Sequence, residues 1–554
     1  MNLIFSVFTI LLSGYLTQAS TSPLVVVGNK FHDLSNGNQF FFKGIAYQAQ
    51  RSRNAPYDRT TETPYIDNLA NATVCMRDLT NLKELGVNII RVYQIDPTKN
   101  HDYCMKVLSE AGVYVIADLA EPNMSIDRNN PFWDVDIFDR YKVVIDSMHK
   151  YDNVAGFLVG NEVANSKLTT SSAPFVKAAV RDTKQYIKQK GYRRIPIGYA
   201  SNDDAEIRNH LANYFVCTDG EEVGTADFYG INIYEWCGYS SYQTSGYRER
   251  TAEFQNFPVP IFFSEFGCNT VSPRPFTEIE ALLSPPMTKV FSGGIAYEYF
   301  NYENNYGVVQ ETGTGDVVKL TDFEYLKNRY VSIDPEGIHI ELSRNQTTNG
   351  GGDNHNAYSP IQCFRSTPFW KVSSLTPPTP NYNKCECLQA SFSCILSPYT
   401  TCNEQELIRE ICTEIDCGEI EVDGAKGVYG KFSDCSLKQR ASHALNLYYN
   451  KHNEDPERCD FNGRAILITN SDEKDLESIH ALNGLKCLEI LGGDSPISNV
   501  RHEVAGGNNK VGQVSGINSN RFNQTTKLML SEGSRLHRMA HLILLAQAAN
   551  YIHI

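Results

Sequence analysis

Two glutamates stand at the ends of two apolar segments, where their carboxyl groups could act as acid, base or nucleophile. In GFLVGNEVAN, the apolar run Phe157–Val159 leads into Asn161 and Glu162. In VPIFFSEFGCN, a second apolar run leads into Ser264 and Glu265. Glycosidases use two carboxyl groups across a cleft: one protonates the leaving oxygen, and the other attacks the sugar carbon or activates water. A single glutamate at a strand end is more often a helix cap or an ion-pair partner, so this interpretation depends on the pair.

The segments that carry the glutamates belong to a longer alternation of short β-rich runs and helical patterns. The predicted strands are Phe40–Ala46, Asn88–Gln94, Tyr114–Leu119, Ala155–Gly160, Ile195–Tyr199, Asp227–Tyr234, Val259–Ser264 and Gly293–Tyr299. Helical patterns intervene, among them Thr73–Leu85, Tyr103–Ala111 and Phe175–Lys190. Such alternation predicts an α/β fold with a parallel sheet, and this number of repeats favours a closed (β/α)8 TIM barrel. An open doubly wound sheet is the alternative, but its usual glycine-rich phosphate loop does not follow the first strand.

A barrel would bring the two glutamates together. Active sites of TIM barrels lie at the carboxyl ends of the strands. Glu162 is predicted to end the fourth strand and Glu265 the seventh, so both face one mouth from opposite sides. In a retaining glycosidase the two carboxyl groups lie roughly 5–5.5 Å apart. The amide of Asn161, beside Glu162, could hold a sugar 2-hydroxyl.

These motifs resemble clan A of the retaining glycoside hydrolases and, in finer detail, glycoside hydrolase family 72, the fungal β-1,3-glucanosyltransferases of the cell wall. The matching segments are FFFKGIAYQ, NIIRVYQIDP, VIADLAEPNMSI, FLVGNEVAN, GYASND, YGINIYEWCG, FFSEFGCN and FSGGIAYEYFNYENNYGVV. They span most of residues 24–330 in matching order and spacing. The region from Cys385 to Cys487 resembles the cysteine-rich carbohydrate-binding module of family 43, which is small, mainly helical and disulfide-rich.

The resemblance implies a role for each matching residue. Glu162 would be the general acid/base, Glu265 the nucleophile, and Asn161 would orient the sugar and the acid. Tyr234 would hydrogen-bond the nucleophile. The full set of implied substrate-binding residues is Tyr93, Asp118, Asn161, Asn202, Asp203, Tyr234 and Tyr297, with Gln48 as a further candidate. Packing at the barrel rim is the alternative role for Tyr93 and Tyr297. The resemblance implies no metal and no other cofactor.

The implied activity is retaining transfer between β-1,3-glucan chains, one acting as donor and the other as acceptor. The enzyme would cleave one chain and join the new reducing end to the non-reducing end of another. Sequence alone does not separate transfer from hydrolysis, so an endo-β-1,3-glucanase with the same residues is one alternative. A catalytically inactive wall-binding protein is another. The joint presence of Asn161, Glu162, Tyr234 and Glu265 argues against it.

The cysteines divide the chain into two units. Six of the 15 cysteines precede residue 370, and nine lie between Cys385 and Cys487. The proline-rich segment PPTP lies between the two groups and predicts a stiff linker. We therefore expect a signal peptide at 1–19, the catalytic domain at 20–370, a linker at 371–384, the cysteine-rich module at 385–490 and a flexible tail at 491–554.

Six cysteines alone can pair in fifteen ways. The resemblance implies the pairs Cys75–Cys104, Cys217–Cys363, Cys237–Cys268, Cys385–Cys435, Cys387–Cys487, Cys394–Cys459 and Cys412–Cys417. It leaves Cys402 free or intermolecular. A zinc site is the rival interpretation, but no Cys-x-x-Cys with matching histidines is present. Helices are predicted at Glu404–Glu414 and Ser436–Tyr449. Whether the module binds glucan or mainly braces the barrel stays open.

Other signals concern the cellular route and the partners. Leu3–Leu16 is largely apolar and small residues end at Ala19, which predicts a signal peptide. The cysteines and four glycosylation sequons fit an oxidising, glycosylating route; the sequons begin at Asn71, Asn123, Asn345 and Asn523. The formal net charge of −14 argues against nucleic acid or an anionic membrane surface as a partner and fits a neutral ligand. We expect a monomer.

The polar, glycine-rich tail predicts a tether with a moderately apolar end at Met539–Ile554. Members of the resembled family commonly end in a glycosylphosphatidylinositol anchor signal. His541 and Gln547 interrupt the apolar end here, so the anchor stays an open alternative. The expected location is the cell surface or cell wall.

Overall fold

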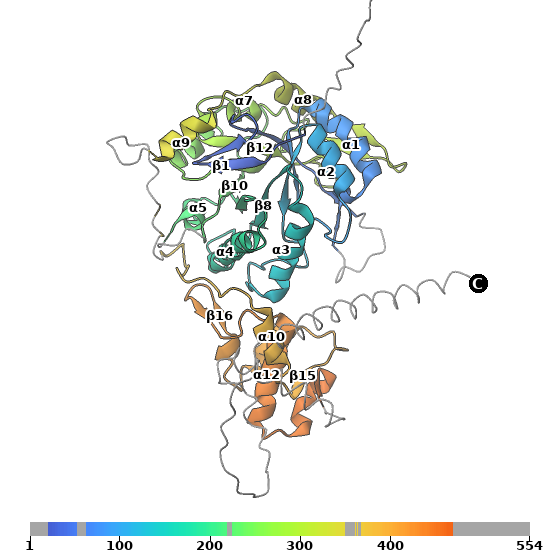
Figure 1. The fold of residues 1–554 in the computed structure, drawn as a ribbon, viewed down its shortest axis with the longest axis vertical. Helices are drawn as coiled ribbons and strands as arrows, with labels where there is room; N and C mark the ends of the chain where they lie inside the picture. The colour runs from blue at the N-terminus through green and yellow to red at the C-terminus, as the bar shows by residue number, and fades with distance from the viewer. Residues whose placement is uncertain are drawn as a thin grey trace, which may run out of the picture. The chain divides into compact units, whose positions relative to one another are not determined.

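The computed structural model describes residues 20–51, 63–218, 224–348, 361, 363 and 367–468 (Figure 1). The predicted signal peptide, the tail at 491–554 and the sequon at Asn523 lie outside these residues. Within the described part of the chain, no helix is both long enough and apolar enough to cross a membrane.

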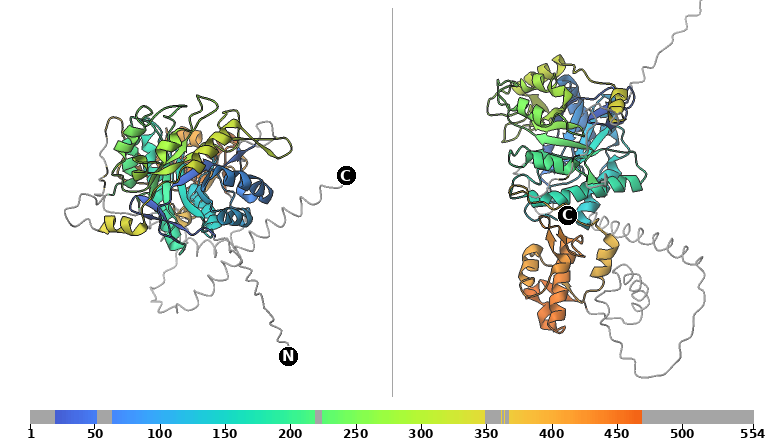
Figure 2. Two further views of the ribbon diagram at one scale, coloured as in Figure 1. Left: turned by 90° about the horizontal axis from the view of Figure 1, so that it is seen from above. Right: turned by 90° about the vertical axis from the view of Figure 1, so that its left-hand side faces the viewer.

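The unit that was predicted to be catalytic is a closed barrel of parallel strands, which confirms the predicted fold class (Figures 1 and 2). In chain order the barrel strands are β3 (Phe42–Ala46), β6 (Ile89–Val92), β7 (Tyr114–Asp118), β8 (Val154–Asn161), β9 (Ile197–Asn202), β10 (Phe228–Asn232), β11 (Ile261–Phe266) and β12 (Phe291–Ala296). Each overlaps one predicted strand. The sheet closes where β12 pairs with β3 in parallel.

Helices follow most barrel strands and cover the outside of the barrel. They are α1 (Ala72–Leu85), α2 (Asp102–Glu110), α3 (Val135–Met148), α4 (Ala173–Gln189), α5 (Arg208–Val216), α6 (Tyr247–Glu253), α7 (Glu278–Leu282) and α8 (Thr321–Ser332). α1 shows why its sequence forms a helix: the Asn71 side chain accepts hydrogen bonds from the backbone N–H groups of Thr73 and Val74, and Gly86 ends the helix at a φ of 73°. The exposed Asn71, Asn123 and Asn345 begin the sequons that lie in described residues.

Short additional strands and one further helix lie outside the barrel sheet. They are β1 (Leu24–Val27), β2 (Lys30–Asp33), β4 (Ala49–Gln50), β5 (Tyr65–Ile66), β13 (Val309–Glu311), β14 (Val317–Lys319) and α9 (Ile340–Thr348). The β1–β2 hairpin contributes Leu24 and Phe31 to the apolar cluster that contains Phe42 and Phe228, the first residues of their strands. The hairpin therefore closes the end of the barrel that is opposite to the carboxyl ends of the strands.

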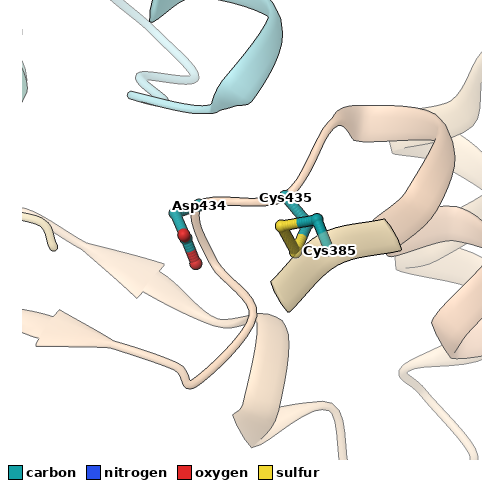
Figure 3. Close-up of side chains that lie close together, drawn as sticks. All are labelled: Cys385, Asp434 and Cys435. Atoms are coloured by element: carbon teal, nitrogen blue, oxygen red, sulfur yellow. A yellow bond between two sulfur atoms is a disulfide. The ribbon is translucent and has the colours of Figure 1, made fainter. Parts of the chain in front are cut away.

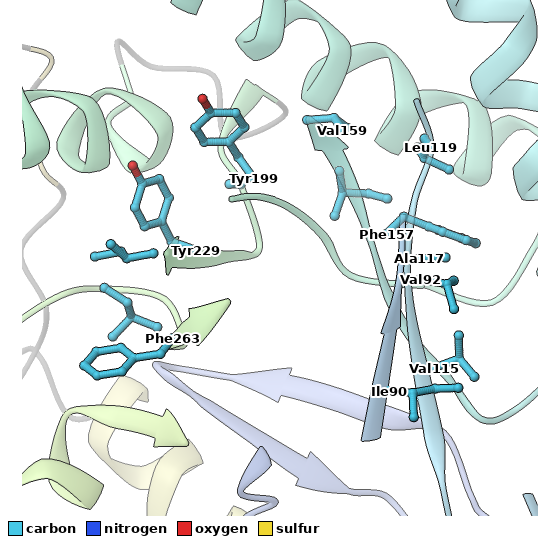
Figure 4. Packing of buried hydrophobic residues seen from close by; sticks show 14 of the residues in the cluster. Ile90, Val92, Val115, Ala117, Leu119, Phe157, Val159, Tyr199, Tyr229 and Phe263 are labelled. Carbon is cyan, nitrogen blue, oxygen red and sulfur yellow. The ribbon is translucent and has the colours of Figure 1, made fainter. Parts of the chain in front are cut away.

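Alternation along the strands separates an inner from an outer apolar layer. Ile89 belongs to the inner cluster, whereas its neighbour Ile90 belongs to the larger cluster that also contains the helices. Figure 4 shows part of this outer cluster, with side chains from several strands. Gly198 on β9 leaves room for the ring of Phe228, which would lie 2.3 Å from a Cβ at that position. The strands are thus buried on both faces, which fits their near-continuous apolar sequences.

The cysteine-rich module is small and mainly helical. Its helices are α10 (Tyr382–Gln389), α11 (Glu404–Ile411) and α12 (Leu437–Lys451), and its strand pairs are β15 (Cys394–Leu396) with β18 (Ala465–Leu467) and β16 (Val422–Asp423) with β17 (Val428–Tyr429). α11 ends before the predicted Glu414. The first helix begins at Tyr382, ahead of the predicted boundary at 385. Its N-cap, Asn381, accepts a hydrogen bond from the Lys384 backbone N–H.

Six of the expected disulfides are present in the structure: Cys75–Cys104, Cys217–Cys363, Cys237–Cys268, Cys385–Cys435, Cys394–Cys459 and Cys412–Cys417. Cys487 lies outside the described residues, so its pairing with Cys387 stays a prediction. Cys402 is a free, half-buried thiol.

Cys385, Asp434 and Cys435 lie close together, but their contacts are structural (Figure 3). The two sulfurs are bonded to each other. The Asp434 carboxylate accepts hydrogen bonds from the Lys384 ammonium and from the Asn381 backbone N–H. Since the sulfurs are not thiolates, this trio lacks the ligands that a zinc ion requires.

The predicted linker follows the barrel surface rather than standing clear of it. Just before it, Trp370 is fully buried, with its ring 5.5 Å from that of Tyr214. Arg181 on α4 donates to the Thr376 hydroxyl and to the Pro377 carbonyl oxygen. The prolines therefore stiffen a segment that is also attached by side-chain contacts.

Candidate active site

The two glutamates occupy the carboxyl ends of the fourth and seventh barrel strands, as the sequence predicted. Glu162 directly follows β8, with an unusual positive φ of 50°. Glu265 is the penultimate residue of β11 and is 8% exposed. A non-glycine residue at positive φ is uncommon and marks a site where the surroundings fix the backbone. Both carboxyl groups therefore belong to the same end of the barrel.

Three donors surround the Glu265 carboxylate. The Tyr93 hydroxyl lies 2.8 Å from Oε1, the Tyr234 hydroxyl 2.9 Å from Oε2, and Arg91 Nη1 3.3 Å from Oε1. Burial raises the pKa of Glu265, as does the nearby Glu162 charge, whereas Arg91 and the tyrosine hydrogen bonds oppose the rise. Burial and the Glu265 charge raise the pKa values of both tyrosines, so these stay protonated donors. This environment suits a carboxylate that acts as a nucleophile.

Arg91 connects the two halves of the site, and the sequence interpretation missed it. It is fully buried on β6, and its Nη2 lies 3.0 Å from Asp118 Oδ2 and 2.9 Å from Asn161 Oδ1. Together with the contact to Glu265, one guanidinium thus holds three predicted site residues. An arginine within the apolar run NIIRV was the available signal, because a buried charge requires a partner.

Asn232 is the second residue that was missed. Its Nδ2 donates to Glu162 Oε1 at 2.8 Å and to Asn161 Oδ1 at 3.2 Å. The Ser264 hydroxyl donates to Asn232 Oδ1 at 2.7 Å, which fixes the amide so that its N–H groups face the glutamate. In this structure the Asn232 amide contacts the Glu162 carboxyl, and the role of Asn161 in orienting the sugar and the acid stays a prediction. The available signal was an asparagine near the end of the predicted strand Asp227–Tyr234.

Tyrosine rings frame the carboxyl groups. The Tyr297 ring lies 6.5 Å from that of Tyr93 and 5.3 Å from that of Tyr306, and the Tyr306 ring lies 5.8 Å from that of Tyr234. Tyr65 stacks on Tyr93 at 6.3 Å. Tyr65 lies on β5 and Tyr306 in a loop, and neither was singled out from the sequence. Ring faces of this kind offer apolar surface to the C–H groups of sugars.

The remaining predicted sugar contacts are engaged with protein partners. Asn202 donates to the Asn165 carbonyl oxygen at 2.8 Å, and Asp203 ion-pairs with Arg208 and Arg250. The Oε1 atom of Gln48 accepts from the backbone N–H groups of Tyr93 and Gln94. Their roles in sugar binding stay predictions.

A cavity of about 260 Å³ adjoins the site, and its lining includes Tyr65, Tyr93, Asp118 and Asn161. A larger cavity of about 900 Å³ contains none of the predicted site residues in its described lining. The smaller cavity is therefore the one that continues the catalytic mouth.

The chain matches one family model and one domain model. Residues 13–334 match the family model described as glucanosyltransferase. The chain belongs to this glucanosyltransferase family. Residues 392–466 match the X8 domain.

Curated relatives agree with this membership. The chain is 49% identical to the 1,3-beta-glucanosyltransferase PGA5 of Candida albicans over 86% of this chain and 76% of that protein. It is 46% identical to the 1,3-beta-glucanosyltransferase GAS2 of Saccharomyces cerevisiae over 83% and 81%. The solved complex of Saccharomyces cerevisiae Gas2p with laminaripentaose superposes with a TM-score of 0.74 at 47% identity, covering 81% of this chain and 97% of that one.

Glu298 is a third carboxyl group near the site, and it predicts how the stability of the folded protein depends on pH. It is 3% exposed and accepts from Asn304 Nδ2 at 2.9 Å. Burial, with the Glu265 charge adding to it, raises its pKa to about 7. A raised folded-state pKa means that the folded protein binds the proton more tightly, so the contribution to stability is present at low pH and is lost as the pH rises from about 4.5 to 7.

We expect Glu298→Gln to flatten the pH dependence of the free energy of unfolding. Between pH 4 and pH 8 the free energy of unfolding of the variant should fall by up to roughly 3 kcal/mol less than that of the wild type. Urea unfolding at both pH values measures this difference. Glu303→Gln, at an exposed site on the same loop, is the control. Equal pH slopes in wild type and Glu298→Gln would contradict the assignment.

Proposed function

We propose that this protein is a retaining β-1,3-glucanosyltransferase that elongates cell-wall β-1,3-glucan. The observation that carries the proposal is the different surroundings of the two carboxyl groups. Glu265 is buried among Arg91, Tyr93 and Tyr234, whereas Glu162 is half-exposed and contacts the Asn232 amide. This asymmetry supports a fixed nucleophile and a separate acid/base.

In the first step, a Glu265 oxygen attacks the anomeric carbon of the donor chain. Glu162 gives its proton to the glycosidic oxygen, so the reducing-end fragment leaves as an alcohol and a glucosyl ester of Glu265 forms. In the second step, Glu162 removes the proton from a hydroxyl at the non-reducing end of the acceptor. That oxygen attacks the same carbon, and the Glu265 carboxylate leaves. The two inversions retain the β configuration.

Transfer requires that an acceptor sugar reaches the glucosyl ester before water does. The ring faces of Tyr297 and Tyr306 lie beside Tyr234, which contacts the nucleophile. A bound acceptor packed on these rings would both present its hydroxyl and exclude water. The relatives named 1,3-beta-glucanosyltransferase support transfer over simple hydrolysis.

The proposed setting is the cell surface or cell wall, reached by secretion. Disulfides in both units and exposed sequon asparagines fit this route. Donor and acceptor are neutral β-1,3-glucan chains bound by a monomer. Attachment through a glycosylphosphatidylinositol lipid is part of the proposal and is tested by release from cells with a phosphatidylinositol-specific phospholipase.

The deciding experiment incubates the secreted protein with a reduced β-1,3-gluco-oligosaccharide and follows product lengths by mass spectrometry. We expect products both longer and shorter than the input, because each cleavage releases one fragment and joins the other to an acceptor. Shorter products alone would identify an endo-β-1,3-glucanase. Unchanged substrate, with binding to insoluble glucan, would identify an inactive wall-binding protein.

A further inference from the structure

Arg274 lies behind the tyrosines of the site and contacts three backbone carbonyl groups. It follows β11 in the chain and is 1% exposed. Its Nη1 donates to the carbonyl oxygens of Gly267 at 3.2 Å and Tyr297 at 2.6 Å, and its Nη2 donates to that of Tyr306 at 2.5 Å. Gly267 is two residues beyond Glu265. One guanidinium therefore links the nucleophile's strand to both rim tyrosines.

Asp322, in the first turn of α8, holds the Arg274 side chain in place. Its Oδ2 accepts from Arg274 Nε at 2.6 Å and its Oδ1 accepts from the Arg274 backbone N–H at 3.1 Å. The guanidinium also packs over the Phe276 ring, with its carbon 4.6 Å from the centroid. The ion pair at Nε and the ring beneath the guanidinium orient the group, and its Nη atoms donate to the carbonyl groups.

Gly267 shows that the chain is shaped around this guanidinium. Its φ is +115°, and a Cβ there would lie 3.2 Å from Arg274 Nη1 and 3.4 Å from the Tyr297 carbonyl oxygen. A side chain at this position would crowd the Arg274 guanidinium and would require a backbone conformation that favours glycine. The close approach of the chain after β11 to the Arg274 guanidinium therefore depends on Gly267.

We propose that Arg274 is a positioning residue that sets Tyr297 and Tyr306 relative to Glu265 and thereby favours transfer over hydrolysis. This inference rests on the proposed function. In the part of the chain that the structure describes, the hydrogen bonds of Arg274 go to Asp322 and to the three carbonyl groups and not to either catalytic carboxyl, so it acts through the two tyrosines. Glu265 has its own donors in Arg91, Tyr93 and Tyr234. Loss of Arg274 should therefore affect acceptor capture more than formation of the glucosyl ester.

The test compares Arg274→Lys and Asp322→Asn with the wild type. A lysine is a compact point charge on a flexible stem, and it cannot reproduce the fixed fork that contacts three carbonyl groups. Asp322→Asn keeps the shape of the side chain and one acceptor oxygen while removing the charge. Lys327→Gln on the same helix removes partly exposed ion pairs and is the control. Donor cleavage and chain elongation are measured together by mass spectrometry.

We expect the ratio of elongated to hydrolysed product to fall about tenfold in Arg274→Lys, because small displacements of a binding surface cost 10-fold to 100-fold. Donor cleavage should stay within about threefold of wild type, since the contacts of Glu265 remain. Asp322→Asn should lower the ratio in the same direction, and Lys327→Gln should leave it unchanged.

Other outcomes would overturn the inference. An unchanged ratio in variants that fold, or a proportional loss of both rates with a lower melting temperature, would mean that Arg274 is merely structural. If Arg274→Lys is not secreted, Asp322→Asn decides by the same ratio. A wild type that makes no longer products would instead remove the proposed function, and this inference with it.

Discussion

Glu265→Gln abolishes turnover of β-1,3-glucan while the protein still folds and is secreted: this is the result we expect, with a loss of order 10⁴-fold or more. The amide cannot form the glucosyl ester. It is nearly the same size as the carboxyl group. Its oxygen can still accept from one of the two tyrosine hydroxyls, and its NH2 group can donate to the other hydroxyl oxygen, so the site should keep its shape. Glu162→Gln should also abolish turnover, because the amide cannot donate a proton to the leaving oxygen. Initial rates on a β-1,3-gluco-oligosaccharide measure both losses.

Alanine variants with added azide can assign the two roles. With an aryl β-1,3-gluco-oligoside as donor, azide in Glu265→Ala occupies the place of the nucleophile and gives the α-azide by one inversion. In Glu162→Ala, azide attacks the glucosyl ester and gives the β-azide by two inversions. The anomer is read by NMR. Exchanged anomers would reverse the assignment, and substantial activity in either glutamine variant would remove that residue from catalysis. Glu110→Gln, in an ion pair with Lys106 on α2, is the control.

The barrel and the glutamate pair could be predicted because they depend on local, repeated patterns. Apolar strands buried on both faces read as short continuous runs, and their carboxyl ends necessarily meet at one mouth. Glu162 and Glu265 follow from that rule alone. The family resemblance then separated them into acid/base and nucleophile, which the alternation of strands and helices could not do.

The partners of the glutamates could not be predicted in the same way, because they depend on register. The pairing of β10 with β11 shifts between Ile231 and Asn232, so Asn232 pairs with Glu265 instead of Ser264. A one-residue shift changes which side chains face the mouth. The contact between Asn232 and Glu162 could therefore be recognised only from the paired strands of the structure.

Two other residues near the site were missed because they lie in loops. Tyr306 and Arg274 lie in loops beyond β12 and β11, and no periodicity places their side chains. Their contacts join residues that are distant in sequence, such as Arg274 with Asp322. The same holds for the linker. The segment PPTP predicted a stiff backbone, but its attachment to Arg181 joins residues that are close only in the folded chain.

Arg91→Met should give the largest loss of stability in the barrel. Asp118 would be left buried without its arginine, and Glu265 would lose its nearest positive charge. Breaking a buried ion pair by removing one partner costs about 3–5 kcal/mol. Urea unfolding at pH 7 measures this loss. Arg464→Met, which removes a partly exposed pair with Glu410, is the control and should cost less than about 1 kcal/mol.

The pH dependence distinguishes this electrostatic cost from simple loss of packing. Burial already raises the pKa of Asp118 and Glu265, and Arg91 is the charge that opposes the rise. Without Arg91 both pKa values rise further, so the carboxyl groups can be neutral at low pH and the penalty shrinks there. The difference between wild type and Arg91→Met should therefore be small near pH 4 and large at pH 7. A difference that stays constant with pH would mean that Arg91 contributes volume rather than charge, and that the hydroxyls of Tyr93 and Tyr234 alone keep the nucleophile ionised.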